Sequence, residues 1–335
     1  MSNEIRTSQR LAGVGEYYFS KKNREIDELR AQGKEVINLG IGSPDLPPPM
    51  SVIEVLGRVA QRPDVHKYQS YSGAPVLRKA FADWYRKYYG VEVDPASEVL
   101  PLIGSKEGII HIFLAYLSPG DKALIPNPGY STYNAAVTLS EGVPVPYELL
   151  PENGWYPDFD ELEKQAEGVK LMICNYPNMP TGAKASRELF RKLIAFGKKH
   201  NILIVHDNPY SFVRNEEPLS LMAEDGAMDI AVEMNSLSKS HNMAGWRVGV
   251  IIGNAQRVDE ILRFKSNMDS GMFYPMQEAA AYALDNLSEE WFEELNGIYY
   301  ERANAETKIT DPQGCTHDVP PAGPCLPATI PDSSA

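Results

Sequence analysis

The sequence predicts an α/β fold, a doubly wound and mostly parallel sheet with helices on both faces. Apolar runs of strand length alternate with helix-length segments from residue 99 to residue 253, which is the pattern of consecutive βα units. Candidate functional residues follow the ends of these strands, where open α/β sheets bind ligands. A chain of 335 residues, 43% of them hydrophobic, can also bury a sizeable core and is expected to form two domains.

The first part of the chain is predicted to be helix, strand and loop in turn. Residues 1–35 carry aromatic and aliphatic side chains on a charged background, as a surface helix does, and residues 36–39 are expected to form a short strand. Residues 40–49 must be a loop, because prolines fix φ and remove backbone donors. Gly42 in this loop would let a ligand approach the backbone closely, although a plain inter-domain turn would have the same composition.

Two further helices are predicted on either side of a polar loop. Residues 50–61 form the first, and Pro75 opens the second, in which aromatic residues recur at helical spacing. That aromatic stripe is expected in the core. The loop at residues 66–73 holds Tyr68 and Tyr71, which have a better claim to a binding site.

A glycine-serine turn joins the first predicted strand of the sheet to a hydrophobic helix. The strand covers residues 99–103, the helix covers residues 109–117, and Gly104, Ser105 and Lys106 lie in the turn. Strand, glycine-serine turn and helix together present free backbone N–H groups to a phosphate. A helix cap explains the same residues nearly as well.

Later strands are followed by side chains that could bind a flat ring. Tyr130 comes after a strand at residues 123–126 and is a candidate for stacking on the ring. Asp207 comes directly after a buried strand at residues 202–205, with Tyr210 three residues on. These two could face a protonated ring nitrogen and a ring hydroxyl. A capping aspartate followed by a packing tyrosine is the alternative.

Lys239 lies in a serine-rich turn, with Ser236 and Ser238 before it and Arg247 eight residues after it. A lysine amine forms a Schiff base with an aldehyde cofactor, and serine and arginine side chains can hold the phosphate of that cofactor. The apolar run at residues 248–252 then predicts a buried strand. A surface loop with a solvated lysine is the competing interpretation of this stretch alone.

Five of these signals share one position in the predicted fold. Gly104, Tyr130, Asn178, Asp207 and Lys239 all lie at or just after the carboxyl end of a predicted strand. A doubly wound sheet gathers those ends along one edge, so we expect a single site there.

The charge and cysteine content exclude several other functions. The formal net charge is -13, which disfavours nucleic acid and anionic membranes as partners. The three cysteines are scattered without zinc spacing, which indicates a reducing compartment. No apolar run approaches the ~18 residues of a membrane span, and the N-terminal residues do not resemble a signal peptide. We therefore expect a cytoplasmic protein with no membrane or nucleic-acid partner.

Taken together, the motifs resemble those of class I/II pyridoxal-phosphate-dependent aminotransferases, which have fold type I and form the aspartate aminotransferase superfamily. The resemblance extends from about residue 36 to about residue 300 and keeps the family's motif order. It implies that Lys239 binds pyridoxal 5′-phosphate (PLP) and moves the substrate's α-proton, while Asp207 pairs with the pyridinium nitrogen and Tyr210 with the ring hydroxyl. The other implied cofactor contacts are the phosphate ligands Gly104, Ser105, Lys106, Ser236, Ser238 and Arg247, the stacking residue Tyr130, and Tyr68, which in this family reaches the phosphate of the partner subunit.

The resemblance also implies an organisation of the chain. Residues 1–48 would form an N-terminal arm and part of a small α+β domain built from both termini. Residues 49–285 would form the large PLP-binding domain, and residues 286–335 an incomplete segment of the small domain. Gly42 would lie beside the substrate carboxylate, and the role of Tyr68 implies a homodimer.

The sequence departs from the family pattern in three places. Met179 stands where the family has an asparagine before Pro-Thr-Gly, so either Asn178 binds the cofactor's ring oxygen through a shifted turn or Tyr210 holds it alone. No arginine follows Arg302, although the family uses a late arginine to bind the substrate carboxylate. Residues 303–335 are rich in proline and poor in periodic apolar residues, which suggests a C-terminally truncated or altered relative.

The activity implied is transfer of an amino group between an amino acid and a 2-oxo acid, as part of amino-acid metabolism. An acidic or diamino acid is the expected donor, because the motifs resemble those of LL-diaminopimelate, aspartate and alanine aminotransferases. A PLP-dependent lyase or decarboxylase of the same fold would keep every cofactor residue and is the first alternative. A relative that binds the cofactor but is inactive is the second.

Overall fold

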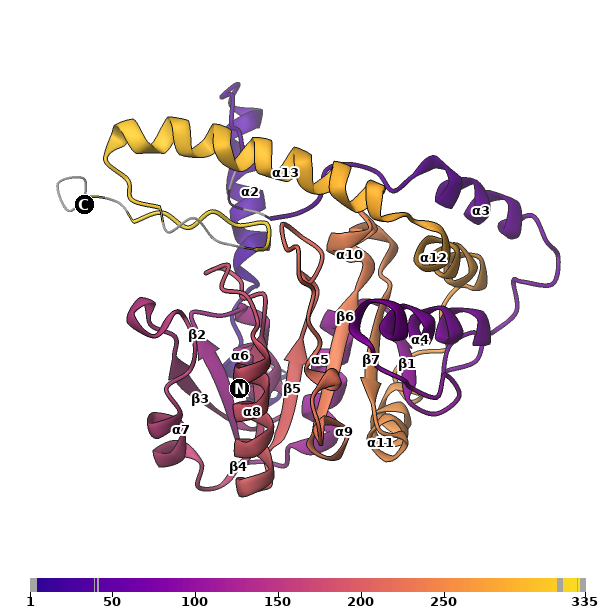
Figure 1. Ribbon diagram of the computed structural model, residues 1–335, viewed down its shortest axis with the longest axis horizontal. Coiled ribbons are helices and arrows are strands. Elements are labelled where there is room, and N and C mark those ends of the chain that lie inside the picture. The colour runs from indigo at the N-terminus through magenta and orange to yellow at the C-terminus, as the bar shows by residue number, and fades with distance from the viewer. Residues whose placement is uncertain (1–4, 39, 41, 318–321, 330, 332–335) are drawn as a thin grey trace.

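The computed structural model describes residues 5–38, 40, 42–317, 322–329 and 331. A seven-stranded sheet has the order β1-β7-β6-β5-β4-β2-β3 (Figure 1). Its strands are β1 (Val99–Leu102), β2 (Lys122–Asn127), β3 (Val143–Glu148), β4 (Val169–Asn175), β5 (Leu203–Asp207), β6 (Ala231–Ser236) and β7 (Gly249–Gly253). Neighbouring strands are parallel except at β7, which runs antiparallel to both β1 and β6. The prediction of a mostly parallel sheet is confirmed.

Helices connect the strands and extend beyond the sheet at both ends of the chain. The α-helices are α1 (Gln9–Ala12), α2 (Tyr18–Ala31), α3 (Met50–Ala60), α4 (Pro75–Tyr89), α5 (Ser105–Tyr116), α6 (Ser131–Leu139), α7 (Phe159–Gln165), α8 (Arg187–His200), α9 (Ala227–Ile230), α10 (Leu237–Ser240), α11 (Ala255–Lys265), α12 (Tyr274–Asn286) and α13 (Glu289–Thr310). Short 3-10 helices are η1 (Pro151–Asn153), η2 (Leu221–Ala223), η3 (Ala244–Trp246) and η4 (Asp311–Gln313).

Both faces of the sheet are covered, because successive side chains of a strand point to opposite faces. Along β4, Leu171 and Ile173 pack into the core formed with α5, α6 and α11. Met172 and Cys174 lie in the other core, with α3, α4, α8 and α12. Burial on both faces is why β4 and β5 are almost continuously apolar instead of alternating.

One buried charge cluster links the central strands to the helices on one face. Glu233 of β6 is fully buried and accepts hydrogen bonds from Tyr85 Oη (2.9 Å), Ser220 Oγ (2.8 Å) and the Leu221 N–H (2.9 Å). Its Oε2 also lies 2.7 Å from His206 Nδ1, and Asn208 Nδ2 donates to Oε1 at 3.5 Å. Because every oxygen of the carboxylate has a partner, the cluster joins α4, β5 and β6 without an unsatisfied buried charge.

Three details differ from the sequence prediction. The strand expected at residues 36–39 is wrong for residues 36–38, which are irregular and lie away from the sheet, with Ile37 85% exposed; residue 39 lies outside the described residues. The helix expected from residue 109 already begins at Ser105, so the phosphate-type turn is the first turn of the helix itself. Asp207 is the last residue of β5 and pairs in register with Asn175 of β4.

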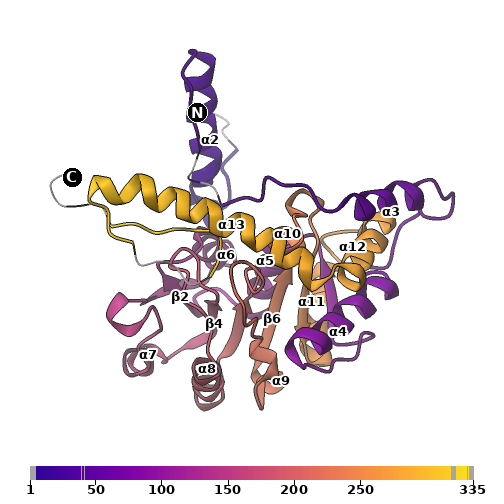
Figure 2. The ribbon, with the colours of Figure 1, turned by 45° about the horizontal axis from the view of Figure 1, so that its top comes forward.

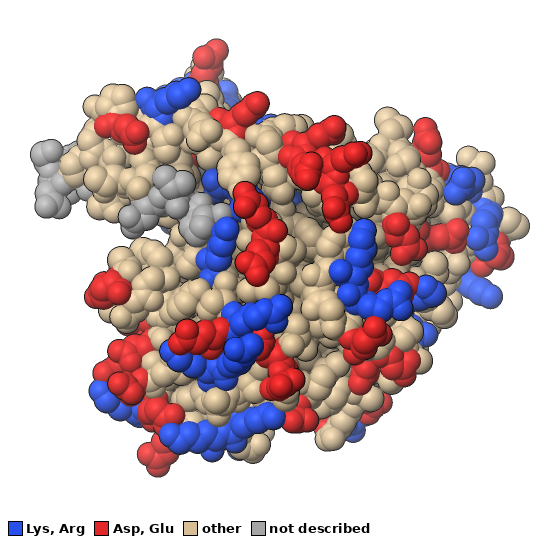
Figure 3. Space-filling view, viewed as in Figure 1, with Lys and Arg blue, Asp and Glu red and all other residues tan. Residues whose placement is uncertain are grey.

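Helices α2 and α13 come from the two ends of the chain and lie outside the sheet (Figure 1). Helix α2 buries none of its residues and stands away from the body, and α13 crosses over the top of the sheet (Figure 2). Acidic and basic side chains are interspersed on the face seen in Figure 3. Among the described residues, every helix is too short or too polar to span a bilayer.

Candidate active site

A cavity of about 400 Å³ opens at the carboxyl ends of the parallel strands. It is lined by Gly42, Ser105, Lys106, Tyr130, Asp207, Tyr210, Ser236, Ser238, Lys239 and Arg247, all proposed from sequence, and by Tyr17, Phe19, Asn23, Tyr133, Asn175, Met179, Pro209 and Ala244. The strand ends thus bring residues more than 100 positions apart to one place, as the fold class predicts.

Lys239 projects into this cavity from α10, directly after β6. Ser236 caps the turn, because its Oγ accepts a hydrogen bond from the Ser238 N–H at 3.1 Å. The ammonium group of Lys239 donates to the carbonyl of Gly42 at 2.6 Å. Burial lowers the pKa of Lys239, the Cys325 thiol opposes that shift, and Arg247 lowers the pKa further. A lowered pKa increases the fraction of neutral amine, which is the nucleophilic form.

Asp207 is a buried carboxylate with only one of its oxygens satisfied. Oδ2 accepts a hydrogen bond from Tyr133 Oη at 2.8 Å, whereas Oδ1 is buried and has no hydrogen-bond partner among the residues that the structure describes. Burial raises the pKa of Asp207 to about 6, although the Tyr133 hydrogen bond acts in the opposite direction. An unpaired buried carboxylate oxygen beside a cavity suits a cationic N–H donor, which is what a protonated pyridine ring offers.

The opposite end of the cavity is arranged for an anion. Helix α5 begins at Ser105, so the unpaired N–H groups of its first turn and its dipole face this end. Arg247 lies over the same turn and donates to the Ala244 carbonyl at 2.9 Å and to Ser238 Oγ at 3.5 Å. Gly104 has φ 78°, and a Cβ there would lie 2.0 Å from Nη2 of Arg247. Glycine at residue 104 therefore leaves the room that the guanidinium needs.

Tyr130 and Tyr17 form an aromatic wall of the cavity. Tyr130 immediately precedes α6, and its hydroxyl lies 3.2 Å from that of Tyr17. The Lys106 ammonium lies 3.9 Å from the centre of the Tyr17 ring, a cation-π contact. Burial, with the Tyr130 hydroxyl, raises the pKa of Tyr17, so it remains a neutral phenol. Tyr17 was not predicted, because it lies in the N-terminal helical region outside any motif.

Comparison with known proteins identifies the family. The family model for aminotransferases of class I and II matches residues 34–307. The chain belongs to this family. The LL-diaminopimelate aminotransferase of Oleidesulfovibrio alaskensis is 42% identical over 329 residues, which cover 97% of this chain and 84% of that protein. The protein of the same name from Aquifex aeolicus is 41% identical over 310 residues, covering 92% of this chain and 80% of that protein.

Solved structures agree with the assignment. Substrate-bound BacF from Bacillus subtilis superposes with a TM-score of 0.94 at 34% identity, over 98% of this chain and 84% of that one. An aspartate aminotransferase variant from Thermus thermophilus superposes with a TM-score of 0.88 at 27% identity, over 96% and 84% of the two chains. The chain is a PLP-dependent aminotransferase, and the fold-type-I architecture inferred from the sequence is confirmed. The comparisons support this activity and not the lyase or inactive alternatives.

Asn178 does not reach the cavity of the aminotransferase. Its side chain is buried in its own turn, where Nδ2 donates to the Asn175 carbonyl at 3.2 Å and Oδ1 accepts from Thr181 Oγ1 at 2.7 Å. Met179 lines the cavity instead, and the Tyr210 hydroxyl donates to its sulfur at 2.9 Å. The shifted-turn hypothesis stays a prediction that the structure does not favour, because the Asn178 amide is bonded inside its own turn and does not line the cavity.

Asn175 is the amide that the sequence analysis overlooked. It ends β4, and its Nδ2 donates to the Asp207 carbonyl at 2.6 Å, while its Oδ1 accepts from the Met179 N–H at 2.9 Å. These bonds hold the turn after β4 against the end of β5. The available signal was its place at the end of a buried strand, the same argument that selected Asp207.

Gly104 and Tyr68, like Asn178, do not line the cavity, whereas Gly42 does. Gly104 supports Arg247 from the turn before α5. Tyr68 is 88% exposed in the single chain and does not line the cavity. Gly42 lines it and also borders a neighbouring cavity of about 630 Å³, which Lys239 shares.

Charged side chains line that neighbouring cavity, most of them from the chain's second half. Arg302 of α13 pairs with Asp45 through two hydrogen bonds, at 2.8 and 3.2 Å. Arg214 is buried and donates to the carbonyls of Gly323 (2.8 Å) and Cys325 (2.9 Å). Arg214 therefore holds the C-terminal segment against the Gly42 loop, and both arginines already have partners within the chain.

Proposed function

We propose that this aminotransferase transfers an amino group from LL-diaminopimelate, or a closely similar diamino dicarboxylic acid, to a 2-oxo acid. The observation that carries the proposal is the similarity to proteins named LL-diaminopimelate aminotransferase, at 42% identity over 97% of the chain. The cavity beside Lys239 is compatible with it. Glu306, which lines it, could face an ammonium group at the far end of such a substrate.

We infer that the cofactor is oriented by groups at both ends of the main cavity. The phosphate would be held by the first turn of α5 together with Ser236, Ser238 and Arg247, where N–H groups and a guanidinium converge. The unpaired Oδ1 of Asp207 would accept the pyridinium N–H at the other end. When bound, PLP supplies an aldehyde carbon and an electron-withdrawing ring.

The remaining residues have roles set by their positions. Lys239, with its lowered pKa, would act as the base that removes the substrate's α-proton and returns it on the cofactor side. Tyr130 would stack on the ring, Tyr210 would bond the ring hydroxyl, and the Gly42 backbone would lie beside the substrate carboxylate. Gly104, Ser105 and Lys106 would complete the phosphate turn.

We also propose that the enzyme is a cytoplasmic homodimer in which Tyr68 reaches the partner subunit's phosphate. The exposure of Tyr68 supports this, as does the exposed Phe273, whose ring contacts His66 of the same loop. We further propose an arm at residues 1–48, a large domain at residues 49–285 and a segment at residues 286–335; the end of α12 at Asn286 supports the boundary between the last two.

The proposal is tested by borohydride reduction and by substrate assays. Reduction with PLP present is expected to fix a pyridoxyl group on the peptide that contains Lys239, as mass spectrometry would show. LL-diaminopimelate with a 2-oxo acid is expected to give amino transfer, with Lys239→Ala as the inactive control. Ammonia release from the amino acid without any oxo-acid acceptor would contradict transamination, and a label on another lysine would contradict the site.

A further inference from the structure

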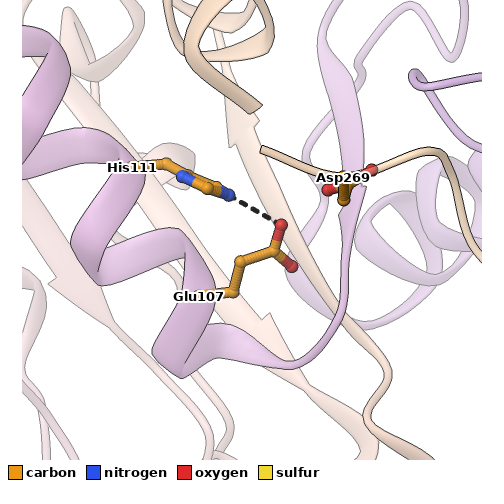
Figure 4. Close-up of side chains that lie close together, drawn as sticks. All are labelled: Glu107, His111 and Asp269. Carbon is orange, nitrogen blue, oxygen red and sulfur yellow. Dashed lines mark hydrogen bonds and ion pairs between the residues drawn. The ribbon is translucent and has the colours of Figure 1, made fainter. Parts of the chain in front are cut away.

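A buried lysine lies directly behind the phosphate-type turn. Lys265 is the last residue of α11, and its side chain is only 1% exposed. Its ammonium donates to Glu107 Oε1 at 2.9 Å and also contacts Asp269. Glu107 and His111 come from α5, with His111 Nε2 2.7 Å from Glu107 Oε1, and Asp269 faces them from the segment after α11 (Figure 4).

The cluster is a lysine-neutralised pair of carboxylates and not a cation site. Glu107, His111 and Asp269 offer ligand atoms within 4.8 Å of one another, a spacing that a metal ion could use. The Lys265 ammonium, however, already contacts both carboxylates. Its positive charge therefore takes the place that a cation would need.

Glu107 lies close to the groups that would bind the phosphate. It is in the first turn of α5, and its Oε2 reaches back to accept a hydrogen bond from the Ile103 N–H, just before Gly104. The donor in that bond is the Ile103 N–H, before the helix, so Glu107 does not occupy the backbone N–H groups of Ser105 and Lys106. Burial alone would raise the pKa of Glu107, but His111 and Lys265 outweigh it and lower the pKa to about 2. The carboxylate is thus ionised at neutral pH.

An ionised carboxylate at this place would oppose a bound phosphate dianion unless it is neutralised. Asp269 adds a second negative charge to the same cluster, and Lys265 supplies the buried positive charge that offsets them. The balance between these negative and positive charges affects a nearby phosphate strongly, because buried charges are screened less by solvent and salt than surface charges.

We propose that Lys265 is a positioning residue for PLP, which offsets the negative charge of Glu107 behind the phosphate-binding turn. The inference rests on the proposed function, because it assumes that the first turn of α5 binds the cofactor phosphate. Lys265 itself touches neither cofactor nor substrate.

Comparison of PLP with pyridoxal, which lacks the phosphate, tests this role. Affinities of the apoenzyme for both compounds are measured for the wild type and for Lys265→Met. We expect the variant to bind PLP about tenfold more weakly and to bind pyridoxal as the wild type does. An equal loss for both compounds, or no loss for PLP, would overturn the proposal, because a purely structural role would not depend on the phosphate.

Further variants test whether PLP affinity depends on the sign of the charge in this cluster. Asp269→Asn removes a negative charge from the same cluster, so its PLP affinity is expected to stay the same or rise. Glu107→Gln combined with Lys265→Met removes both charges and is expected to regain most of the lost preference for PLP over pyridoxal. Lys192→Met removes an exposed lysine that pairs with Glu188 on α8, and it should leave both affinities unchanged.

The outcomes separate this proposal from the proposed function. If the wild type is labelled at Lys239 by PLP and borohydride while Lys265→Met keeps the wild-type ratio of affinities, only the role of Lys265 fails. If Lys265→Met does not fold, Asp269→Asn decides, since a tenfold loss of PLP affinity in that variant would contradict the charge argument. If the wild type binds neither compound, the proposed function fails.

Discussion

At the scale of single residues, Asp207 has the most specific chemistry of the site. One oxygen is bonded to Tyr133, and the other is buried and unpaired. We expect Asp207→Asn to lower kcat by roughly 10- to 100-fold, because a hydrogen bond to a charged group contributes about 1.5–3 kcal/mol. Steady-state kinetics with a saturating amino donor measures this. Tyr147→Phe, which loses a buried hydroxyl bonded to the Ile173 carbonyl, is the control and should keep kcat near the wild-type value.

The same carboxylate makes the stability of the apoenzyme depend on pH. Burial raises its pKa from 3.8 to about 6, so the folded state binds this proton more tightly than the unfolded state does. Stability contributed by the protonated form is therefore present below pH 3.8 and is lost as pH rises through about 6. A shift of about 2 units corresponds to about 3 kcal/mol.

We therefore expect the free energy of unfolding of the wild-type apoenzyme, minus that of Asp207→Asn, to fall by about 2.4 kcal/mol between pH 4 and pH 7. Urea unfolding at a series of pH values measures the difference, and the variant cancels the titration of all other groups. A difference that stays constant or rises with pH would contradict the shift. Saturating PLP is expected to reduce the fall, because its cationic ring nitrogen favours the ionised carboxylate.

At the scale of elements, the turn into α5 depends on a glycine for a reason that the sequence does not show. Gly104 has φ 78°, and its missing Cβ leaves room for the Arg247 guanidinium. We expect Gly104→Ala to displace Arg247 and to weaken PLP binding about tenfold or more, since a charge-assisted phosphate contact is lost. Equilibrium dialysis of the apoenzyme with PLP measures the affinity.

Gly90 supplies a matched control for this prediction. It ends α4 with φ 68°, and a Cβ there meets no atom within 4 Å. Gly90→Ala therefore carries the cost of an alanine in the left-handed region, roughly 1 kcal/mol, without any clash. Both variants should lose stability, but only Gly104→Ala should lose PLP affinity. A similar loss of affinity in Gly90→Ala would show that backbone strain alone is responsible.

The elements also show which parts of the fold could be predicted. The strands around the site could be predicted from short apolar runs that are bounded by turn residues. Strands β4 and β5 are buried on both faces, so their apolar runs stand out in the sequence. The strand expected at residues 36–39 is wrong for residues 36–38, because an apolar pair in a short segment does not specify a neighbouring strand. The reversal of β7 was not foreseen either, because strand direction depends on packing beyond the 12-residue connection at residues 237–248.

Within the site, too, sequence patterns did not reveal contacts that form only when the chain packs. Motifs identified Lys239 and Asp207, whose chemistry requires those residue types at strand ends. Asn178 was proposed from its spacing to Pro-Thr-Gly, and spacing does not reveal that its amide is bonded inside its own turn, away from the cavity. Tyr17 could not be found, since its contact with Tyr130 joins segments 113 positions apart in the sequence.

At the scale of the whole molecule, the exposed loop that contains Tyr68 requires a partner for the role we propose. The side chain is 88% exposed, although the same loop is anchored near residue 271, where a Cβ on Gly271 would lie 2.7 Å from the Gln69 carbonyl. A rigidly seated loop with an exposed tyrosine at its tip suits contact with a second copy of the chain. We expect sedimentation velocity to give a dimer.

Within that dimer, Tyr68→Phe removes a single hydroxyl and leaves the apolar surface intact. We expect it to remain dimeric and to bind PLP about tenfold more weakly, with little change for pyridoxal, because a hydrogen bond to a charged phosphate is lost. Tyr71→Phe, in the same loop and 47% exposed, is the control and should keep the wild-type affinity. A monomer that binds PLP with the wild-type affinity would contradict the shared site, since one subunit would then hold the phosphate with its own residues alone.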